Sequence, residues 1–288
     1  MIKPELEMGP ERAKERYVTE AVYEQGSGAL NEDTLLMKGN VFGVFDGASS
    51  IDYWKDQSGK TGGFLAANIV KEIMEKGGEE QPLREQLLAA NERLAEKMQI
   101  QGIDITKKSN RWAVAAAAIR AGNKKFEWAQ IGDSRILVIY KDGSYKTLGS
   151  NIDFDVESLV LWKSLVQRGE RSAFDHQEMH KQMVKVREKS NIDYGFLNGE
   201  SEVEQFLASG EEPLENIASI LIFTDGLTIP KEDPTGEDSL DKLVKLYQAG
   251  GLKKVKDFIR EEEQKDPEFQ KYTRFKPHDD IAAIAVNL

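Results

Sequence analysis

The sequence has no cysteine among its 288 residues. This absence excludes disulfide scaffolds, thiolate metal sites and cysteine nucleophiles. No apolar run approaches the roughly 20 residues that are needed to span a bilayer, and the charged N-terminal stretch lacks the apolar segment of a secretory signal. We therefore expect a cytoplasmic protein that does not bind membranes.

Positive charge is scarce as well. Lysine and arginine together number 39 against 50 aspartates and glutamates, which gives a formal net charge of −11. An acidic chain generally repels the phosphate backbone of nucleic acids. The longest basic cluster, "GGLKKVKDF" (250–258), stands beside the acidic "REEEQK", as is typical of a solvated helix face. We expect no nucleic-acid partner.

Nothing in the composition divides the chain into parts. Hydrophobic residues make up 40% and charged residues 31%, which is ordinary for a globular protein long enough to bury a large core. No repeat, low-complexity tract or proline-rich linker interrupts it. We predict one domain.

The order of the expected elements indicates the fold class. Turn signals and apolar periodicity predict strands at 17–25, 33–38, 41–47, 218–227 and 279–286, helices at 58–77 and 82–99, and two helices within 238–264. Residues 111–149 have the pattern of an antiparallel meander, and 153–190 are mostly helical. Strands and helices do not alternate regularly, which favours mixed antiparallel sheets covered by helices over a doubly wound parallel sheet.

Acidic residues occupy the edges of five apolar segments. The segments are "NEDTLL", "FDGASS", "IGDSRI", "FTDGLT" and "HDDIAA", which carry Glu32, Asp33, Asp46, Asp133, Asp225, Asp279 and Asp280. If these edges meet, the carboxylates repel one another strongly unless a positive charge joins them. The sequence shows no matching cluster of lysine or arginine at the edges. Hard divalent cations such as Mg²⁺ or Mn²⁺, which prefer oxygen ligands, supply that charge.

Such a cluster also suggests a reaction. Two divalent ions roughly 3.5–4 Å apart share a bridging water, lower its pKa and direct it in line at a phosphorus atom. Cysteine is absent and no serine–histidine pair is visible. A metal-activated water is therefore the most available nucleophile.

These five segments stand in the same order as the matching motifs of a known family, and they cover nearly the whole chain. They are "NED" (31–33), "VFDGASS" (44–50), "IGDSRILV" (131–138), "FTDGL" (223–227) and "HDDIAAIAV" (278–286). The family is the metal-dependent type 2C serine/threonine protein phosphatases, and the chain is similar to a divergent bacterial subgroup. The resemblance implies an α+β fold, a four-layer α/β/β/α sandwich with two central, mainly antiparallel sheets flanked by helices. It also implies that residues 1–288 form a single domain with a variable, flap-like insertion at about 150–218.

The resemblance assigns roles to five positions. Asp46 is expected to bridge two ions, and Asp225 and Asp279 to complete one of the two sites. These three are the expected catalytic residues. Glu32 and the carbonyl oxygen of Gly47 are expected to serve the other site.

Further roles follow for neighbouring positions. The resemblance implies that Asp133 helps to hold a third, weaker ion and that Asp33 acts indirectly or through a water. Glycine at 47 allows the backbone to approach an ion without a Cβ in the way, and the same reasoning applies to Gly226 after Asp225.

The chain departs from the family pattern at several places. Ala48 stands where a histidine often follows the first Asp-Gly pair, and no arginine lies between Arg16 and Asn31 to bind phosphate. The proton donor and the phosphate-binding side chain are therefore unassigned. Asp280 replaces a common asparagine, and it either tightens metal binding or faces solvent.

Other candidates have a structural explanation. His176 and His180 are four residues apart, as zinc ligands on a helix are, but a solvated helix face is favoured. His278 is expected to point away from the metals because side chains alternate along a strand. "SGKTGGF" (58–64) suggests a phosphate loop, yet glycines at a helix start explain it better.

The sequence thus predicts a Mn²⁺- or Mg²⁺-dependent phosphatase. It would hydrolyse phosphoserine and phosphothreonine esters through a water or hydroxide that bridges two ions, on a phosphorylated protein or a small phosphoester. We expect a monomer. The alternative is a signalling or adaptor module of this fold with weak or no turnover. A haloacid dehalogenase mechanism is nearly excluded, because its Asp-x-Asp-Gly motif would need an aspartate where Val44 stands.

Overall fold

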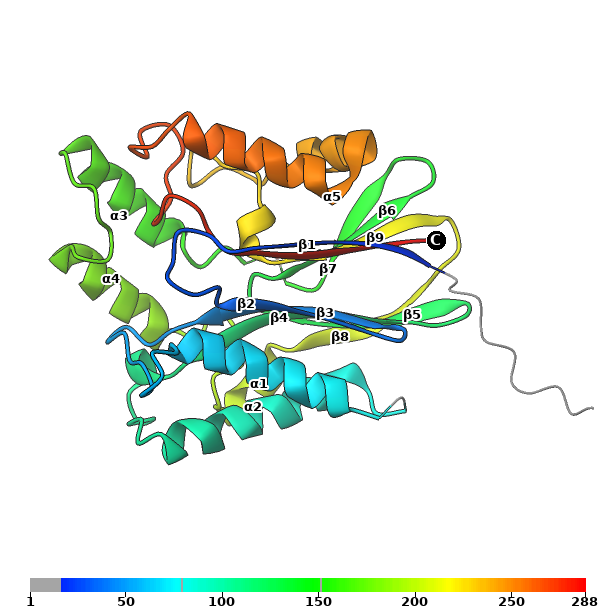
Figure 1. Cartoon of the computed structure of the whole chain (residues 1–288), viewed down its shortest axis with the longest axis horizontal. Coiled ribbons are helices and arrows are strands. Elements are labelled where there is room, and N and C mark those ends of the chain that lie inside the picture. Colours follow the sequence, from blue (N-terminus) through cyan, green and yellow to red (C-terminus); the bar gives the residue numbers. More distant parts are fainter. Residues whose placement is uncertain (1–16, 79, 151) are drawn as a thin grey trace, which may run out of the picture.

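Two five-stranded antiparallel sheets form the centre of the molecule (Figure 1). The computed structural model describes residues 17–78, 80–150 and 152–288. The first sheet has the order β1-β10-β9-β6-β7, with strands Val18–Glu24, Ile281–Asn287, Ile217–Phe223, Arg135–Tyr140 and Tyr145–Leu148. The second has the order β2-β3-β4-β5-β8, with strands Asp33–Lys38, Val41–Ala48, Ala113–Ala121, Lys125–Ile131 and Ala208–Pro213.

Helices cover the outer faces of both sheets (Figure 1). Helices α1 (Gly62–Lys76) and α2 (Leu83–Ile100) lie on the second sheet, and α5 (Leu240–Gln264) lies on the first. Helices α3 (Val156–Gln167) and α4 (Gln177–Glu188) stand at one end of the sandwich. The predicted four-layer α+β sandwich is confirmed.

Short elements and interruptions complete the chain. The 3₁₀ helices are Lys108–Asn110 (η1), Ser201–Gln205 (η2) and Asp225–Leu227 (η3). Non-helical backbone at Gly250 and Gly251 divides α5 into two helical segments, as predicted for 238–264. Of the helices in the described part of the chain, none has the length and apolar character to cross a bilayer.

Strand alternation decides which side chains enter the space between the sheets. Phe42 and Val44 of β3 pack in the core between the sheets, whereas Phe45 packs against α1 and α2. Because side chains alternate along a strand, Asp46 continues the face of Phe42 and Val44. Its carboxylate therefore enters the space between the sheets, at the end where β3 finishes.

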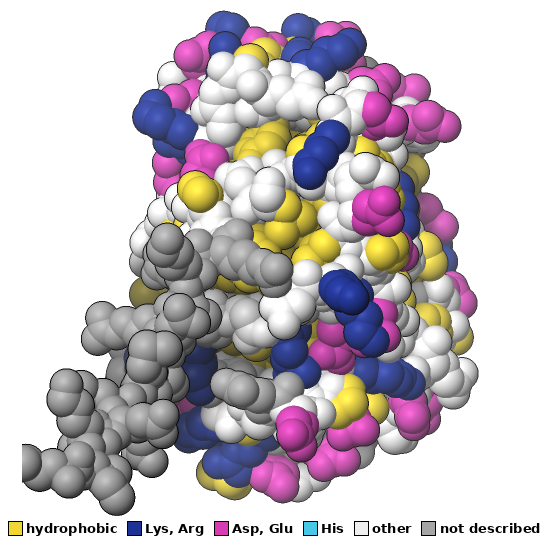
Figure 2. Space-filling view, turned by 90° about the vertical axis from the view of Figure 1, so that its right-hand side faces the viewer, with side chains coloured by type: hydrophobic (Ala, Val, Ile, Leu, Met, Phe, Trp, Pro, Cys, Tyr) yellow, Lys and Arg dark blue, Asp and Glu magenta, His cyan; other side chains and the backbone are white. Residues whose placement is uncertain are grey.

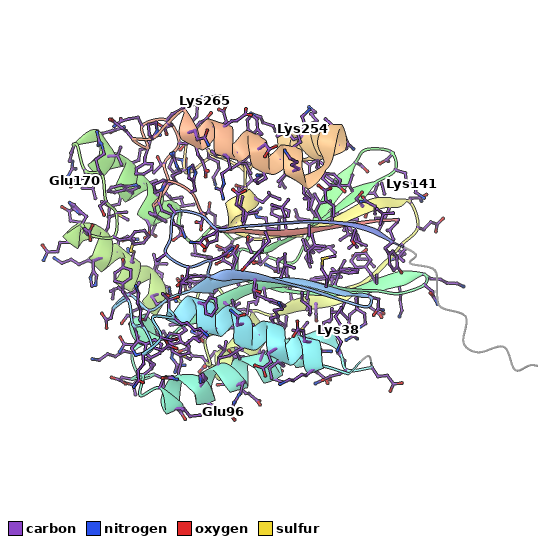
Figure 3. The ribbon with its side chains drawn as sticks, viewed as in Figure 1. Lys38, Glu96, Lys141, Glu170, Lys254 and Lys265 are labelled. Atoms are coloured by element: carbon purple, nitrogen blue, oxygen red, sulfur yellow. The ribbon has the colours of Figure 1, made fainter. Side chains whose placement is uncertain are left out.

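Charged residues away from this end point outward. The labelled side chains in Figure 3, among them Lys38, Glu96 and Lys254, lie on the outside of the layers. Figure 2 shows the end of the sandwich opposite α3 and α4, where lysine and arginine are mixed with acidic side chains around hydrophobic ones. The acidic cluster described below belongs to the other end.

Residues 111–149 do not form a single meander, and that prediction is wrong. Strands β4 and β5 pair in the second sheet, whereas β6 and β7 pair in the first. The chain crosses between the sheets at Gly132, whose φ of 76° is a left-handed conformation that favours glycine. Local turn residues look alike whether the chain returns to its sheet or leaves it. The crossing carries Asp133 to the place where the sheets meet.

The stretch 150–218 contains α3, α4 and the unpredicted strand β8. β8 forms the edge of the second sheet, antiparallel to β5. Its sequence, "ASGEEP", lacks the apolar alternation by which strands are recognised, and its side chains are exposed or only partly buried. Backbone pairing and ion pairs such as Lys125–Glu211 hold it in place.

Candidate metal centre and substrate cleft

Three aspartates from both sheets meet at the α3–α4 end of the sandwich. One carboxylate oxygen from each of Asp46, Asp133 and Asp225 lies within 4.8 Å of the other two. Asp46 lies near the end of β3, Asp133 lies on the crossing from β5 to β6, and Asp225 begins η3 after β9. Residues far apart in the sequence therefore form one acidic centre.

The centre is electrostatically unfavourable without a cation. Burial raises the pKa of Asp46 well above its ordinary value, and the charges of Asp33 and Asp133 add to this. The pKa of Asp225 is raised in the same way, by burial and then by Asp279 and Asp46. Burial raises the pKa of Asp133 to about 6. These carboxylates would share a site in ionised form only beside a compensating positive charge.

An unpaired oxygen supports the same conclusion. Oδ1 of Asp133 is buried and has no hydrogen-bond partner among the described residues. A buried polar atom without a partner is uncommon in folded proteins and calls for a ligand or an ion. Carboxylate oxygens are the donors that Mg²⁺ and Mn²⁺ prefer. The residues at the centre therefore fit a hard divalent cation.

Glu32 and Asp279 lie beside the three aspartates but outside their tight group. Both line the same cleft as Asp46 and Asp225. Oε1 of Glu32 accepts a hydrogen bond of 2.6 Å from the Ser49 hydroxyl. Oδ1 of Asp279 forms an ion pair of 2.6 Å with Lys276.

Lys276 is a cation that sequence reasoning missed. Burial by itself lowers its pKa, but the carboxylates of Asp279 and Asp225 outweigh burial and raise it above the ordinary lysine value. The inference that no basic cluster serves the acidic edges is therefore incomplete, because Lys276 and, from α4, Arg187 line the same cleft. The sequence shows a lysine three positions before Asp279, which could have indicated this cation. It does not show that the lysine side chain points toward the carboxylates.

Asp33 and Asp280 form hydrogen bonds that fix the segments around the acidic centre. The buried carboxylate of Asp33 accepts a hydrogen bond of 2.6 Å from the Thr224 hydroxyl, which ties the second sheet to the end of β9. The carboxylate of Asp280 accepts hydrogen bonds from the backbone N–H groups of Gly26 (2.7 Å) and Glu32 (2.8 Å). Asp280 is only 5% exposed, so of the two alternatives for this residue the solvent-facing one is wrong. It anchors the backbone that carries Glu32.

Close backbone packing explains the two Asp-Gly pairs. A Cβ on Gly47 would lie 2.2 Å from the carbonyl oxygen of Gly63 at the start of α1, and one on Gly226 would lie 1.9 Å from the carbonyl oxygen of Asp280. Both glycines are therefore required by protein contacts, not only by the approach of an ion as the sequence argument holds. Gly62 and Gly63 of "SGKTGGF" are the first residues of α1. Thr61 caps the helix, and its hydroxyl accepts a hydrogen bond from Phe64 N–H.

The acidic centre forms the floor of a main cleft of about 510 Å³. We define the main cleft by its floor (Glu32, Asp46, Asp225, Asp279) and by wall residues that include Tyr53, Phe174, Arg187 and Lys276. Tyr53 packs edge-on against Phe174, with ring centroids 6.3 Å apart, and Phe174 lies 6.5 Å from Phe275. The cleft therefore combines an acidic floor with an aromatic rim.

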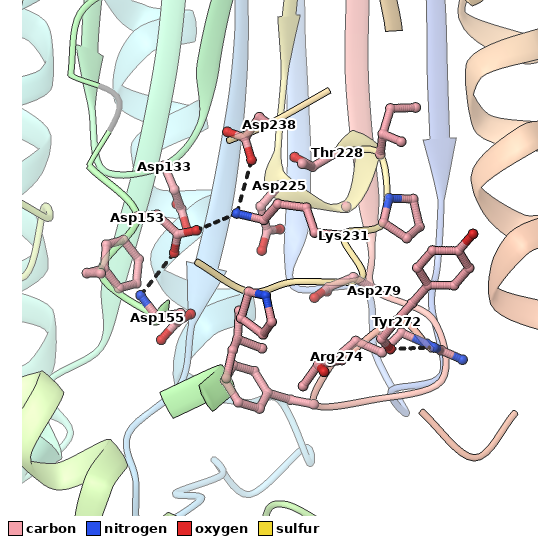
Figure 4. Close-up of a pocket in the computed structure, with 18 of the residues that line it drawn as sticks. Asp133, Asp153, Asp155, Asp225, Thr228, Lys231, Asp238, Tyr272, Arg274 and Asp279 are labelled. Atoms are coloured by element: carbon pink, nitrogen blue, oxygen red, sulfur yellow. Dashed lines mark hydrogen bonds and ion pairs between the residues drawn. The ribbon is translucent and has the colours of Figure 1, made fainter. Parts of the chain in front are cut away.

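A side cavity adjoins the main cleft and shares Asp133 and Asp225 with it (Figure 4). Here Lys231 bridges Asp153, at 2.9 Å, and Asp238, at 3.2 Å. These ion pairs join the base of the α3–α4 segment to the loop after η3. Burial, with the charges of Asp133 and Asp153, raises the pKa of Asp155 to about 7.

The histidines lie away from the centre. Nδ1 of His278 contacts Oε2 of Glu263 of α5 at 2.7 Å. The ring therefore points away from the acidic centre, as predicted, and His278 is not among the described residues that line the cleft above that centre. His176 caps α4 by accepting a hydrogen bond from Glu178 N–H, and His180 is exposed. Neither histidine of this pair is among the described residues that line the main cleft.

Comparisons with known proteins agree with this architecture. A sequence model of the protein phosphatase 2C family matches residues 23–261, whereas no curated protein sequence matches the chain. The fold is similar to serine/threonine phosphatase Stp1 from Staphylococcus aureus (17% identity, 100% of this chain and 99% of that one, TM-score 0.56). It is also similar to PstP/Ppp from Mycobacterium tuberculosis (17% identity, 94% and 98% covered, TM-score 0.56).

A further solved structure is the catalytic domain of PstP in complex with two manganese ions (17% identity, 94% of this chain and 97% of that one, TM-score 0.54). At such identities the structural likeness establishes the fold alone. The family match covers far more than half of the chain. The chain therefore belongs to the protein phosphatase 2C family of metal-dependent serine/threonine phosphatases.

Proposed function

We propose that this chain hydrolyses phosphoserine and phosphothreonine esters of proteins with the aid of two divalent cations, Mn²⁺ or Mg²⁺. The observation that carries the proposal is the convergence of Asp46, Asp133 and Asp225, whose oxygens lie within 4.8 Å of one another. They come from separate strand ends of two sheets, and the fold has gathered them despite their mutual repulsion. A cluster of this kind is stable in ionised form only around cations.

The family resemblance suggests how the ligands divide. Asp46 would contact both ions, Asp225 and Asp279 would complete one site, and Glu32 with the Gly47 carbonyl would complete the other. Asp133, with its unpaired Oδ1, would hold a third, weaker ion. When bound, the ions lower the pKa of a water and neutralise charge on the phosphoryl oxygens.

The chain's own contacts keep these ligands in position. The Ser49 hydroxyl orients the Glu32 carboxylate, and it also accepts a hydrogen bond of 3.0 Å from Gly63 N–H. Asp280 fixes the Glu32 backbone. Lys276 restrains the Asp279 carboxylate and offsets part of the acidic charge. Outer contacts of this sort commonly affect metal affinity by ~10–100-fold.

The main cleft fits a phosphorylated side chain better than a free nucleotide or nucleic acid. Its acidic floor would bind phosphate only through cations, while the aromatic rim of Tyr53, Phe174 and Phe275 offers apolar contact to the residues beside a phosphoserine. We further propose that the chain works as one domain. In support, β1 near the beginning of the described chain pairs along its length with β10 near the end.

Hydrolysis of p-nitrophenyl phosphate, with and without Mn²⁺, tests the function. We expect turnover that chelator abolishes and that falls at least ~100-fold in Asp46→Asn and Asp225→Asn, because each variant removes a ligand of the ions that activate water. Asp257→Asn, on the exposed face of α5, is the matched control and should keep full activity.

Two outcomes would count against the proposal. Turnover that persists with chelator or in both variants would refute the metal mechanism. An inactive parent protein that still binds Mn²⁺ would support the adaptor alternative. Repeating the assay with Mg²⁺ and with a phosphoserine peptide identifies the preferred ion and the substrate class.

A further inference from the structure

Arg187 is the cation of the main cleft whose contacts are incomplete. It lies in the last turn of α4, where a positive charge is favoured by the helix dipole. Its Nη2 donates a hydrogen bond of 3.1 Å to the carbonyl oxygen of Ser49. Its Nη1 is buried and has no hydrogen-bond partner in the described part of the chain.

The charge of Arg187 also lacks a close partner. Within the described residues, no carboxylate forms an ion pair with it at 4.0 Å or less. Burial lowers the pKa of Arg187, and the neighbouring Tyr194, Asp155 and Glu32 oppose that shift. Arginine side chains are not deprotonated in proteins, so the guanidinium carries its charge at neutral pH. A buried cation with a free donor is costly unless an anion reaches it.

The other cations of the main cleft are differently placed. Lys276 is held by Asp279 at 2.6 Å, and Lys55 is exposed at the rim. Arg187 is instead anchored through Ser49, only three residues after Asp46. A guanidinium presents parallel N–H donors that match two oxygens of a phosphoryl group, which an ammonium does not.

We propose that Arg187 is the phosphate-binding side chain of this enzyme. Its free Nη1 would donate to a phosphoryl oxygen of the substrate held at the acidic centre, while Nη2 stays on the Ser49 carbonyl. Substrate binding would thereby fasten α4 to the end of β3, which carries Asp46. This inference concerns the same site and rests on the proposed phosphatase function.

Binding of inorganic phosphate to the Mn²⁺-loaded full-length protein tests the proposal directly. We expect Arg187→Gln to raise the dissociation constant for phosphate at least ~10-fold, the loss that corresponds to one charge-assisted hydrogen bond. Arg187→Lys should have an intermediate dissociation constant for phosphate, because lysine keeps the charge but lacks the parallel N–H donors of the guanidinium. Affinity for Mn²⁺ should change less than affinity for phosphate, because Arg187 is not expected to contact the ions.

Lys185→Gln is the matched control. Lys185 is on the same helix and carries the same charge, but it pairs with the exposed Glu157 on the outer face. Its phosphate affinity should equal that of the parent protein. With p-nitrophenyl phosphate, Arg187→Gln should raise KM and the inhibition constant for phosphate, whereas Lys185→Gln should raise neither.

Three results would overturn the proposal. One is unchanged phosphate affinity in Arg187→Gln, or in Arg187→Lys if the glutamine variant does not fold. Another is an equal loss of Mn²⁺ affinity, which would mean that Arg187 acts only through Ser49 and Glu32. A parent protein that does not bind phosphate would overturn it as well. An inactive parent that binds phosphate through Arg187 would reject the phosphatase function but keep this inference.

Discussion

At the scale of single residues, the centre depends as much on the groups that position the acidic side chains as on those side chains. Asp280 shows this most clearly, because its two oxygens accept the backbone N–H groups of Gly26 and Glu32. These residues precede β2, whereas Asp280 precedes β10. One carboxylate therefore joins two distant segments directly behind Glu32.

Asp280→Asn should weaken metal binding. An asparagine keeps one acceptor oxygen and can therefore keep one of the two hydrogen bonds. Its NH₂ group would face the other backbone N–H, and because both groups are donors, that hydrogen bond is lost. We expect the dissociation constant for Mn²⁺ to rise ~10-fold or more, measured by isothermal titration calorimetry. Glu96→Gln on the exposed face of α2 removes the same charge and should leave it unchanged. Equal affinities in the two variants would show that Asp280 has no positioning role.

At the scale of elements, the junction of β3 with α1 brings Gly47 and Glu32 close together. The carbonyl of Gly63, at the start of α1, packs against Gly47 of β3, and a Cβ on Gly63 would meet the Glu32 carboxylate at 2.7 Å. The sequence predicts the β2–β3 hairpin and both helices correctly, because each has a local period and a turn signal. It does not predict how closely helix and strand approach.

Gly47→Ala tests this close approach. The added methyl group would lie 2.2 Å from a backbone carbonyl, so either α1 or β3 must move. We expect the free energy of unfolding in urea to fall by about 1–3 kcal/mol, as overpacking typically does. Gly78→Ala is the control, because a Cβ there meets nothing within 4 Å. A Gly47→Ala protein as stable as this control would contradict the packing argument.

The crossing between β5 and β6 sets the limit of prediction at this scale. The stretch around Gly132 has the same turn residues as a hairpin, so the sequence predicts a single meander. The crossing depends on which sheet offers partners to β6, and β9 does so through a long pairing from Arg135 to Tyr140. That partner lies about 80 residues later in the chain.

At the scale of the whole molecule, the fold stores electrostatic repulsion at one end of the sandwich. Asp133 and Asp155, with pKa values raised to about 6 and about 7, bind protons more tightly in the folded than in the unfolded state. Their contribution to stability is therefore complete below the unfolded pKa, near 4, and is lost as pH rises through 6 and 7. Divalent cations should remove this loss, because they neutralise the ionised carboxylates.

Thermal unfolding of the chelator-treated protein checks the sign of this effect. We expect the Tm to fall between pH 5.5 and pH 8, and to recover at pH 8 when Mn²⁺ is added. Asp155→Asn should reduce the fall by about 2 °C or more, because a neutral amide no longer ionises in the buried site. A Tm that rises with pH without metal, in both proteins, would contradict the raised pKa values.

The sequence by itself determined the chemistry of the centre. The resemblance carried by five acidic segments in one order predicted the fold class, and the repulsion expected among their carboxylates predicted a need for cations, because strand ends and turns are encoded locally. The tertiary structure alone decided which carboxylates touch, that Asp280 holds Glu32, and that Lys276 and Arg187 turn into the cleft. These contacts join segments from opposite ends of the chain, and their geometry depends on sheet pairing and helix packing, which no local pattern specifies.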